Sequence, residues 1–384
     1  MPSPLDRRVW LEANTLRNHG YKTIILCPNS SLFPKLYECI EGIQIYRYPQ
    51  LIEGRTVIGI AFEYLLSFIF ISVFQLLIQV RHKIEIVQYC NPPDFLMFTD
   101  LLVRLSGRKV IFDQHDVVPE LWLAKDKKKN SVLYKIISWL EVKSIMNADA
   151  VLFASEGFAE KSERIKDLKA KPFRIVKTAP VSNFGNQITK SDAKSDGKAF
   201  CIGYIGRMGK QDNVELLLRS FAILIQRIDH SQIKLKLVGD GPERQRLERL
   251  ACDLLIQDSV QFLGYIVDEN ELSEKLKTCD IAVCPDIPNE MNHIASMNKI
   301  VEYMALELPI VQFDLRENTK TCGEFSFVVK TPDMNSLADA MYQLLNDEEL
   351  RFRMRKGAKA RFLNELCWEV QEKKLLDLYK IVGN

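Results

Sequence analysis

Three absences narrow the possibilities for this sequence before any motif is considered. None of the nine cysteines forms a C-x-x-C pair, which favours reduced thiols in a cytosolic compartment over a disulfide framework or a zinc site. The formal net charge is only +2, so nothing global points to nucleic-acid binding. Residues 1–8 hold two prolines and three charged residues without an apolar core segment, so no signal peptide is expected.

The length and the polarity of the chain indicate two α/β domains. At 384 residues there is room for two domains of ~100–200 residues each. Residues 182–199 are polar and rich in Ser, Lys and Asp, so we interpret them as a linker between a first domain (1–181) and a second (200–362). Residues 1–180 carry a net charge of +6 and residues 181–384 a net charge of −4. Only one domain is therefore expected to face an anionic surface or ligand.

The first domain begins in an unusual order. Residues 6–20 predict a helix that Gly20 closes, and the first strands follow only at 22–27 and 43–46. A doubly wound domain normally opens with a strand that lies centrally in its sheet. We expect either that the natural chain starts further upstream or that the sheet lacks a central strand, and we favour the shortened start because removing a central strand is costly.

Residues 58–80 form the most apolar stretch, and its length suits three structures. It could be a long helix packed in the core, a helix lying in a membrane interface, or a helix that spans a bilayer at ~20 residues. Glu63, Gln75 and Gln79 interrupt it, so we favour the core helix. The run KDKKKN at 125–130 predicts a solvated loop that could also touch anionic lipid headgroups.

Candidate catalytic groups follow a predicted strand of the first domain. Residues 84–88 and 109–112 predict strands, with a helix at 95–105 between them. The run Asp113-Gln114-His115-Asp116 follows the second strand at its carboxyl end. Ligands and catalytic groups gather at the carboxyl ends of strands in such sheets, so His115 and Asp116 are our catalytic candidates.

The second domain contains the parts of a phosphate site. The strand 200–205 runs into GRMGKQD, and the strand 235–238 runs into GDGPE. The strand 281–284 is followed by a polar loop at 285–296 and then by a helix that begins near Met297. Lys299 and Glu302 lie three residues apart and share a face of that helix. Because helix N-termini and glycine loops bind anions, we predict a nucleotide-diphosphate site here.

These motifs together resemble family 4 of the retaining glycosyltransferases. GRMGKQD, VGDGPERQRLE, VQFLGY and NKIVEYMALELPIV occur in the family's order and spacing. DRRVWLEANTLRNHGYKTIILCP, VQYCNPPDF and FDQHDVVPEL resemble its bacterial surface-polysaccharide subgroup. The resemblance covers nearly the whole chain. It implies a GT-B fold, in which two Rossmann-like domains face each other across a cleft and a C-terminal helix, residues 363–384, packs back on the first domain.

The resemblance also implies roles for individual residues. Arg207 and Lys210 would hold the donor diphosphate, Glu302 would accept hydrogen bonds from the ribose hydroxyls, and Lys299 would lie near the phosphates. Backbone N–H groups of 291–293 would contact the sugar or phosphates, and Asp240 could merely shape its turn. The donor-binding candidates are Gly206, Arg207, Lys210, Gly239, Asp240, Asn292, Asn298, Lys299 and Glu302.

The sequence departs from the family at one position. The first acid of the family's E-x7-E motif falls on Ile294, and the nearest polar residues are Glu290 and Asn292. In many members this acid contacts the donor sugar. The identity of the sugar is therefore the least predictable property of the site.

The implied reaction is a retaining transfer of a hexosyl or N-acetylhexosaminyl unit, from a UDP-linked donor, to a lipid-linked or saccharide acceptor. His115 would stand over the sugar, and the leaving phosphate would help to deprotonate the acceptor, with neither metal nor cofactor. The protein would lie in the cytoplasm at the inner face of the cell membrane, in peripheral contact with anionic lipid. A sugar-nucleotide epimerase of the GT-B type and a catalytically inactive partner subunit remain the alternatives.

Overall fold

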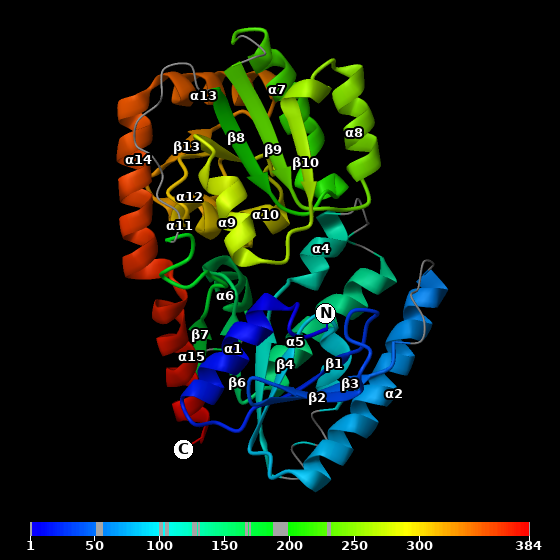
Figure 1. Cartoon of the computed structure of the whole chain (residues 1–384). Helices are drawn as coiled ribbons and strands as arrows, with labels where there is room; N and C mark the ends of the chain where they lie inside the picture. The colour runs from blue at the N-terminus through cyan, green and yellow to red at the C-terminus, as the bar shows by residue number, and fades with distance from the viewer. Residues whose placement is uncertain are drawn as a thin grey trace.

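The computed structural model has two halves, each of which contains β-sheet, and one lies above the other in the view of Figure 1. The structure describes residues 2–50, 57–99, 103, 107–124, 129, 131–165, 168, 170–186, 199–228 and 232–383. Most of the predicted linker, most of the KDKKKN run and much of the predicted helix 95–105 lie outside these residues. We call the half with β1–β7 the first domain and the half with β8–β13 the second domain.

The strands of the first domain form two sheets. β1, β3 and β2 make one sheet in that order, and β4, β5, β6 and β7 make a second, fully parallel sheet. Among the described residues β1 and β4 are edge strands that do not pair with each other. The strands are β1 (Ile24–Pro28), β2 (Tyr37–Ile40), β3 (Ile43–Tyr48), β4 (Ile86–Cys90), β5 (Lys109–Gln114), β6 (Ala150–Phe153) and β7 (Phe173–Ile175).

Helices of the first domain begin where short polar side chains can cap them. Asp6 accepts a hydrogen bond from Val9 N at the start of α1, and Ser131 and Ser155 cap α5 and α6 in the same way. The helices are α1 (Arg7–Asn18), α2 (Val57–Arg81), η1 (Asp94–Phe98), α4 (Val118–Ala124), α5 (Val132–Asn147) and α6 (Glu156–Ser162). The helix predicted at 6–20 is thus two residues shorter at its end.

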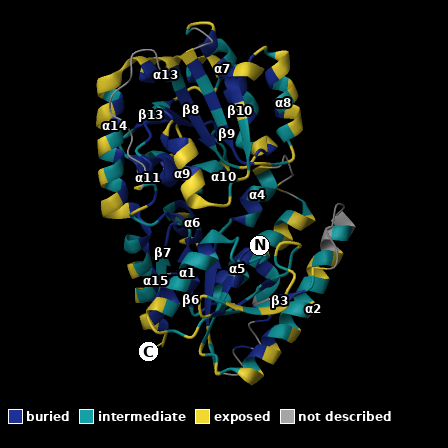
Figure 2. Cartoon of the chain, in the orientation of Figure 1, coloured by how far each residue is buried: buried dark blue, intermediate teal, exposed yellow. Residues whose placement is uncertain are grey.

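The helix α2 lies on the outside of the first domain (Figures 1 and 2). Only 11% of its apolar window Phe62–Arg81 is buried, so the favoured interpretation of a core-packed helix is wrong. By length and composition this is the one helix of the described residues that could cross a membrane. Its exposure leaves a large apolar face to be explained.

The second domain is a single parallel sheet with helices on both faces. Its strand order is β10-β9-β8-β11-β12-β13, which places β8 and β11 at the centre. The strands are β8 (Phe200–Ile205), β9 (Ile233–Val238), β10 (Val260–Gly264), β11 (Ile281–Cys284), β12 (Ile310–Phe313) and β13 (Ser326–Val329). The helices are η3 (Lys210–Asp212), α7 (Val214–Ile225), α8 (Arg244–Asp253), η5 (Gln257–Ser259), α9 (Glu269–Lys277), α10 (Glu290–Ile294), α11 (Asn298–Ala305), α12 (Arg316–Cys322), α13 (Met334–Asn346) and α14 (Glu348–Arg361).

The chain ends on the first domain. After the short π-helical segment η6 (Phe362–Leu366), α15 (Trp368–Gly383) leaves the second domain and packs on β6 and β7 (Figure 1). Its Trp368, Leu375 and Leu378 join the apolar core formed by Ile111 and Leu152. This crossing gives the two domains a second connection besides the linker.

Apolar side chains of α10 lock the two domains together. Met291 and Ile294 of the second domain are buried in an apolar cluster that otherwise belongs to the first domain, with Phe112 and Phe158 among its members. A Cβ on Gly157 of α6 would lie only 2.6 Å from the Cα of Ile294. The departure from the family at position 294 therefore has a structural role, because a carboxylate there would be buried in an apolar cluster.

Hydrogen bonds and ion pairs surround this apolar contact. Ser155 Oγ donates to the carbonyl of Ile294 at 2.6 Å. Glu317 of α12 accepts hydrogen bonds from the amides of Glu156 and Gly157 at the start of α6 and pairs with Lys177 at 2.8 Å. The carboxylate thus stabilises the N-terminus of a helix in the other domain.

We expect that Gly157→Ala will weaken the contact between the domains. The added methyl group would overlap backbone atoms of Ile294, and overpacking of this kind typically costs about 1–3 kcal/mol. Urea unfolding should show a lower free energy of unfolding, and small-angle scattering should show a larger radius of gyration. Gly383→Ala, where a Cβ meets nothing within 4 Å, is the control, and equal behaviour of the two variants would contradict the role of Gly157.

Candidate functional site

Two glycine loops touch at the carboxyl ends of β8 and β9. Gly206 and Gly239 have φ angles of 156° and 130°, and a Cβ on Gly239 would lie 1.9 Å from the carbonyl oxygen of Gly206. The loops are tied by Met208 N, which donates to the carbonyl of Asp240 at 2.9 Å. Only glycine permits this approach at position 239. The structure therefore brings together both loops of the predicted phosphate site.

Most polar candidates near these loops are exposed. Arg207, Lys210 and Asn298 all have exposed side chains, and Asn298 is the first residue of α11. Asp240 is exposed too, but its Oδ1 accepts from Gly241 N at 2.7 Å and its Oδ2 pairs with Arg244 at 3.2 Å. Asp240 thus shapes its own turn, as expected if its role is only structural.

Lys299 lies beneath the Gly206 loop. Its Nζ is 2.7 Å from Asp286 Oδ2 and 5.1 Å from the centroid of the Tyr204 ring. Burial opposes the charge on Lys299, but the carboxylate of Asp286 outweighs it and holds the lysine pKa well above its ordinary value. The ion pair therefore supports the loop from below, rather than leaving Lys299 open to solvent.

Glu302 faces the first domain from the next turn of α11. The carboxylate is buried, and its Oε1 accepts a hydrogen bond from NH1 of Arg7 at the start of α1. NH2 of Arg7 lies 3.1 Å from Glu269 of α9. Burial raises the pKa of Glu302, and the positive charge of Arg7 opposes that rise. The predicted ribose acceptor is thus paired with a residue of the other domain.

The segment before α11 differs from the predicted loop. Residues 290–294 form the short helix α10, and Asn289 caps it by accepting from Asn292 N at 2.7 Å. His293 N donates to the carbonyl of Asn289 at 3.0 Å. The amides of Asn292 and His293 therefore hydrogen-bond within α10, and the contact of residues 291–293 with the donor stays a prediction. The side chain of Asn292 donates to the carbonyl of Ile287 at 2.9 Å.

In the first domain, His115 is bonded to Asp113 rather than to Asp116. His115 Nε2 lies 2.6 Å from Asp113 Oδ2, whereas the backbone N–H and C=O of Asp116 bond to Asn91. Asp113 and His115 are two residues apart at the end of β5, and this spacing places them on one face. The spacing was the sequence signal that could have identified Asp113.

Asp113 is the centre of a buried charged network. Arg8 of α1 donates to both of its carboxylate oxygens, at 3.1 and 2.7 Å, and lies 3.2 Å from Glu12. Gln88 donates to Glu12 at 2.6 Å and accepts from Tyr379 of α15 at 2.7 Å. The network joins α1, β4, β5 and α15. Only the folded chain brings these residues together.

The network sets the protonation of its members. Burial opposes ionisation of both Asp113 and His115. The charge of Arg8, followed by that of His115, outweighs burial and lowers the pKa of Asp113, while the charge of Asp113 raises the pKa of His115 well above 6.5. Burial, followed by the charge of Asp113, raises the pKa of Glu12 to about 8. At neutral pH His115 is therefore an imidazolium, which suits donating a hydrogen bond and does not suit accepting a proton.

The same cluster contains a set of potential metal ligands. Donor atoms of Cys90, Asp113 and His115 lie within 4.8 Å of one another. However, Arg8 already binds both oxygens of Asp113, and its guanidinium would repel a cation. Burial also raises the pKa of the Cys90 thiol to about 11. The cluster favours a proton on His115 over a metal ion.

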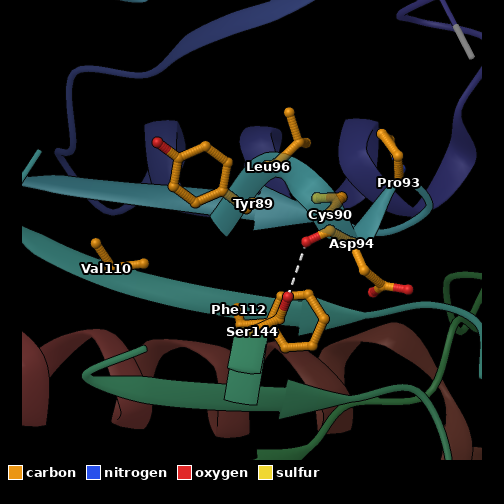
Figure 3. A pocket seen from close by; sticks show the side chains of 8 residues that line it. All are labelled: Tyr89, Cys90, Pro93, Asp94, Leu96, Val110, Phe112 and Ser144. Carbon is orange, nitrogen blue, oxygen red and sulfur yellow. Dashed lines mark hydrogen bonds between the residues drawn. The ribbon is translucent and has the colours of Figure 1, made fainter. Parts of the chain in front are cut away.

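Two cavities lie near the candidate residues. A small one, of about 10 Å³, lies among residues of β4, η1 and β5, where Ser144 Oγ donates to the carbonyl of Asp94 at 2.9 Å (Figure 3). It has room for no more than about one water molecule. A groove of about 1090 Å³ lies between the domains and is lined by Glu290, His293 and Arg316 on one side and by Glu120, Lys161 and Arg164 on the other. Its volume is close to the upper end of the range of small-molecule sites in proteins.

We expect His115 to be protonated at pH 7.5 in the unaltered protein. In Asp113→Asn the pKa of His115 should fall, so that the imidazole is neutral at this pH. Because the folded-state pKa of His115 is raised in the unaltered protein, the imidazolium stabilises the fold fully below about pH 6.5 and loses this contribution as pH rises through the folded value. NMR titration of the five histidines would measure the pKa, with Asp253→Asn, an exposed acid on α8, as control. A His115 pKa near 6.5 in the unaltered protein would refute the network.

Comparison with known proteins supports the predicted family. The model for glycosyl transferases group 1 matches residues 186–361. Alpha-D-kanosaminyltransferase of Streptomyces kanamyceticus is 25% identical over 264 residues, which are 65% of this chain and 64% of that protein. N-acetylgalactosamine-N,N'-diacetylbacillosaminyl-diphospho-undecaprenol 4-alpha-N-acetylgalactosaminyltransferase of Campylobacter jejuni is 23% identical over 278 residues, 71% of this chain and 70% of that protein. The alignment thus spans under two thirds of the length of the first relative.

A solved structure supports the fold over the whole chain. HepE of Anabaena, in complex with UDP, superposes with a TM-score of 0.69 at 13% identity and covers 99% of this chain and 97% of its own. The predicted α/β architecture of GT-B type is confirmed. Residues 186–361 of this chain match the glycosyl transferases group 1, in agreement with the predicted family, and lie within a GT-B fold.

Proposed function

We propose that this protein is a retaining glycosyltransferase that moves a hexosyl or N-acetylhexosaminyl unit from a UDP-linked donor to a saccharide or lipid-linked acceptor in cell-surface polysaccharide synthesis. One observation carries the proposal. The consecutive residues Arg7 and Arg8 at the start of α1 contact Glu302 of the second domain and Asp113 of the His115 network, respectively, so α1 connects the two candidate regions. The Campylobacter jejuni relative is named for a diphospho-undecaprenol acceptor, and HepE is in complex with UDP; these two names support a lipid-linked acceptor and a UDP-linked donor.

In this proposal the second domain binds the donor. The exposed Arg207 and Lys210 neutralise the diphosphate beside the touching glycine loops, where backbone N–H groups can approach the phosphates closely. Glu302 accepts hydrogen bonds from the ribose hydroxyls. Lys299 holds the Gly206 loop in position through its pair with Asp286. No metal is required, because fixed cations stabilise the leaving diphosphate.

The first domain acts on the sugar and the acceptor. His115, as an imidazolium, donates a hydrogen bond to the sugar, while the leaving phosphate takes the proton of the acceptor hydroxyl. The groove between α4 and α6 on one side and α10 and α12 on the other receives the acceptor saccharide. Its mixed lining of Glu and Arg or Lys side chains suits hydroxyl groups and a nearby phosphate.

Binding of nucleotide sugars tests the proposal directly. We expect calorimetry to detect a UDP-sugar, and Arg207→Ala and Glu302→Ala to weaken binding by about tenfold or more, since each removes a charge-assisted hydrogen bond. Arg249→Ala, which removes an exposed arginine of α8, should leave the affinity unchanged. Equal affinities in all variants would place the donor elsewhere. Turnover of the donor without acceptor, to an epimer, would favour the epimerase instead.

We also propose that the first domain lies on an anionic membrane surface at the cytoplasmic face. Exposed apolar residues gather on α2, η1 and α5, where Phe95 contacts Tyr64 and Phe68 of α2, and Phe98 contacts Trp139 of α5. The exposed members include Leu65, Ile69, Val73, Leu76, Val80, Val132, Ile136 and Trp139. Contiguous patches of this kind mark interaction sites. Arg81, Lys129 and Lys135, all exposed, border them with positive charge.

Vesicle flotation tests the membrane contact. The protein should float with vesicles of anionic phospholipid, more strongly at low salt, and the double variant Leu76→Glu, Trp139→Glu should remain at the bottom because both changes place a charge on the apolar face. Val267→Glu, at an apolar residue of the second domain that is more exposed than either Leu76 or Trp139, is the matched control. If the unaltered protein does not float in either salt condition, the proposed membrane contact is contradicted.

A further inference from the structure

The contact between Arg7 and Glu302 has a geometry that calls for a functional explanation. Arg7 belongs to the first turn of α1 and reaches across to two acidic residues of the second domain, Glu302 and Glu269. The guanidinium also lies over the ring of Phe184, 5.6 Å from its centroid. Its side chain is 28% exposed, whereas that of Glu302 is 9% exposed. Arg7 thus covers an almost buried carboxylate.

The hydrogen bonds of the ion pair between Arg7 and Glu302 are incomplete, which a purely structural contact would avoid. Arg7 Nε is shielded from solvent and has no hydrogen-bond acceptor among the described residues. A buried donor without an acceptor lowers the stability of the fold, and such groups are uncommon in folded proteins. Glu302 likewise sits where burial opposes its charge. Both members of the ion pair are therefore held in positions that reduce the stability of the fold.

We propose that Arg7 is a positioning residue for the nucleotide donor, which holds the Glu302 carboxylate in place for the ribose hydroxyls and so couples donor binding to the contact between the domains. The inference rests on the proposed function, because it assigns the ribose to Glu302. Arg7 takes Oε1 of Glu302 and leaves Oε2 to accept from the ribose. A guanidinium suits this task because separate N–H groups of its rigid planar fork reach Glu302 and Glu269 at once.

The neighbouring residue extends the coupling to the first domain. Arg8 binds Asp113, which holds His115, so two consecutive residues of α1 contact the candidate groups of both domains. Since α1 is one rigid helix, a displacement of Arg7 on opening of the cleft would also move Arg8. The first turn of α1 therefore links Glu302, the proposed ribose-binding carboxylate, to the imidazolium of His115.

The charges around Glu302 give the test a distinct signature. Among the described residues, Arg7 of α1, Glu269 of α9 and Lys299 of α11 are the charged groups that act most strongly on Glu302. Without Arg7, burial and the like charge of Glu269 favour the protonated carboxyl, which is a weaker acceptor for hydroxyl donors. Loss of Arg7 should thus weaken donor binding more at low pH than at high pH, which loss of packing alone would not do.

The experiment measures UDP binding to the full chain by calorimetry at pH 6.0 and pH 8.5 for the unaltered protein, Arg7→Met and Arg7→Lys. We expect Arg7→Met to bind about tenfold more weakly at pH 6.0 and to recover most of that loss at pH 8.5, with Arg7→Lys in between. Dividing each affinity by that of the unaltered protein at the same pH removes the ionisation of UDP itself. Arg17→Met is the matched control, because Arg17 lies on the same helix and is also 28% exposed.

A double-mutant cycle with Glu302→Gln identifies the partner. If Arg7 acts through Glu302, Arg7→Met should change the affinity little when Glu302 is already Gln. UDP binding by Arg7→Met and Arg7→Lys equal to that of the unaltered protein at both pH values would overturn the inference alone. No UDP binding by the unaltered protein would overturn the proposed donor site and this inference together.

Discussion

The ion pair between Arg8 and Asp113 is the interaction on which the first domain most depends. Both side chains are almost completely buried, at 5% and 0% exposure, so neither charge is stabilised by water. Removing one partner of such a pair typically costs about 3–5 kcal/mol because the other charge stays buried and alone. The pair fixes α1 against β5, and through Gln88 it also reaches Tyr379 of α15. The orientation of His115 follows from it.

The contact between the domains combines an apolar anchor with polar bonds around it. Ile294 enters the apolar core of the first domain, while Glu317, Lys177 and Ser155 satisfy backbone groups at the same place. The large groove between the domains borders this contact, since Gly157 and Ile294 also line it. The anchor therefore helps to determine the distance between the two candidate binding regions. This explains why an apolar side chain stands at a position where the family often has an acid.

Local sequence patterns identified most elements and the order of the motifs. Polar caps, glycine loops and apolar runs act within a few residues, and they indicated the strands around His115, the loops at Gly206 and Gly239 and the helix of Lys299. The patterns failed where the structure depends on contacts between residues that are far apart in the sequence. The apolar run 58–80 has the composition of a core helix, yet α2 lies on the outside, because periodicity cannot say what a helix packs against. The residues 290–294 are polar enough for a loop, yet two apolar side chains and the cap at Asn289 make them a helix.

The sequence by itself determined the fold class, the resemblance to the glycosyl transferases group 1 and the position of the glycine loops along the chain. These properties depend on motifs whose residues are close in sequence. Only the tertiary structure decided which charges meet. Arg7 is 295 residues away from Glu302 and Arg8 is 105 residues away from Asp113, and no local pattern specifies such pairs. Because the energy of a buried charge depends on its partner and its burial, the protonation of His115 and the pairing of Glu302 arise only when the chain is folded.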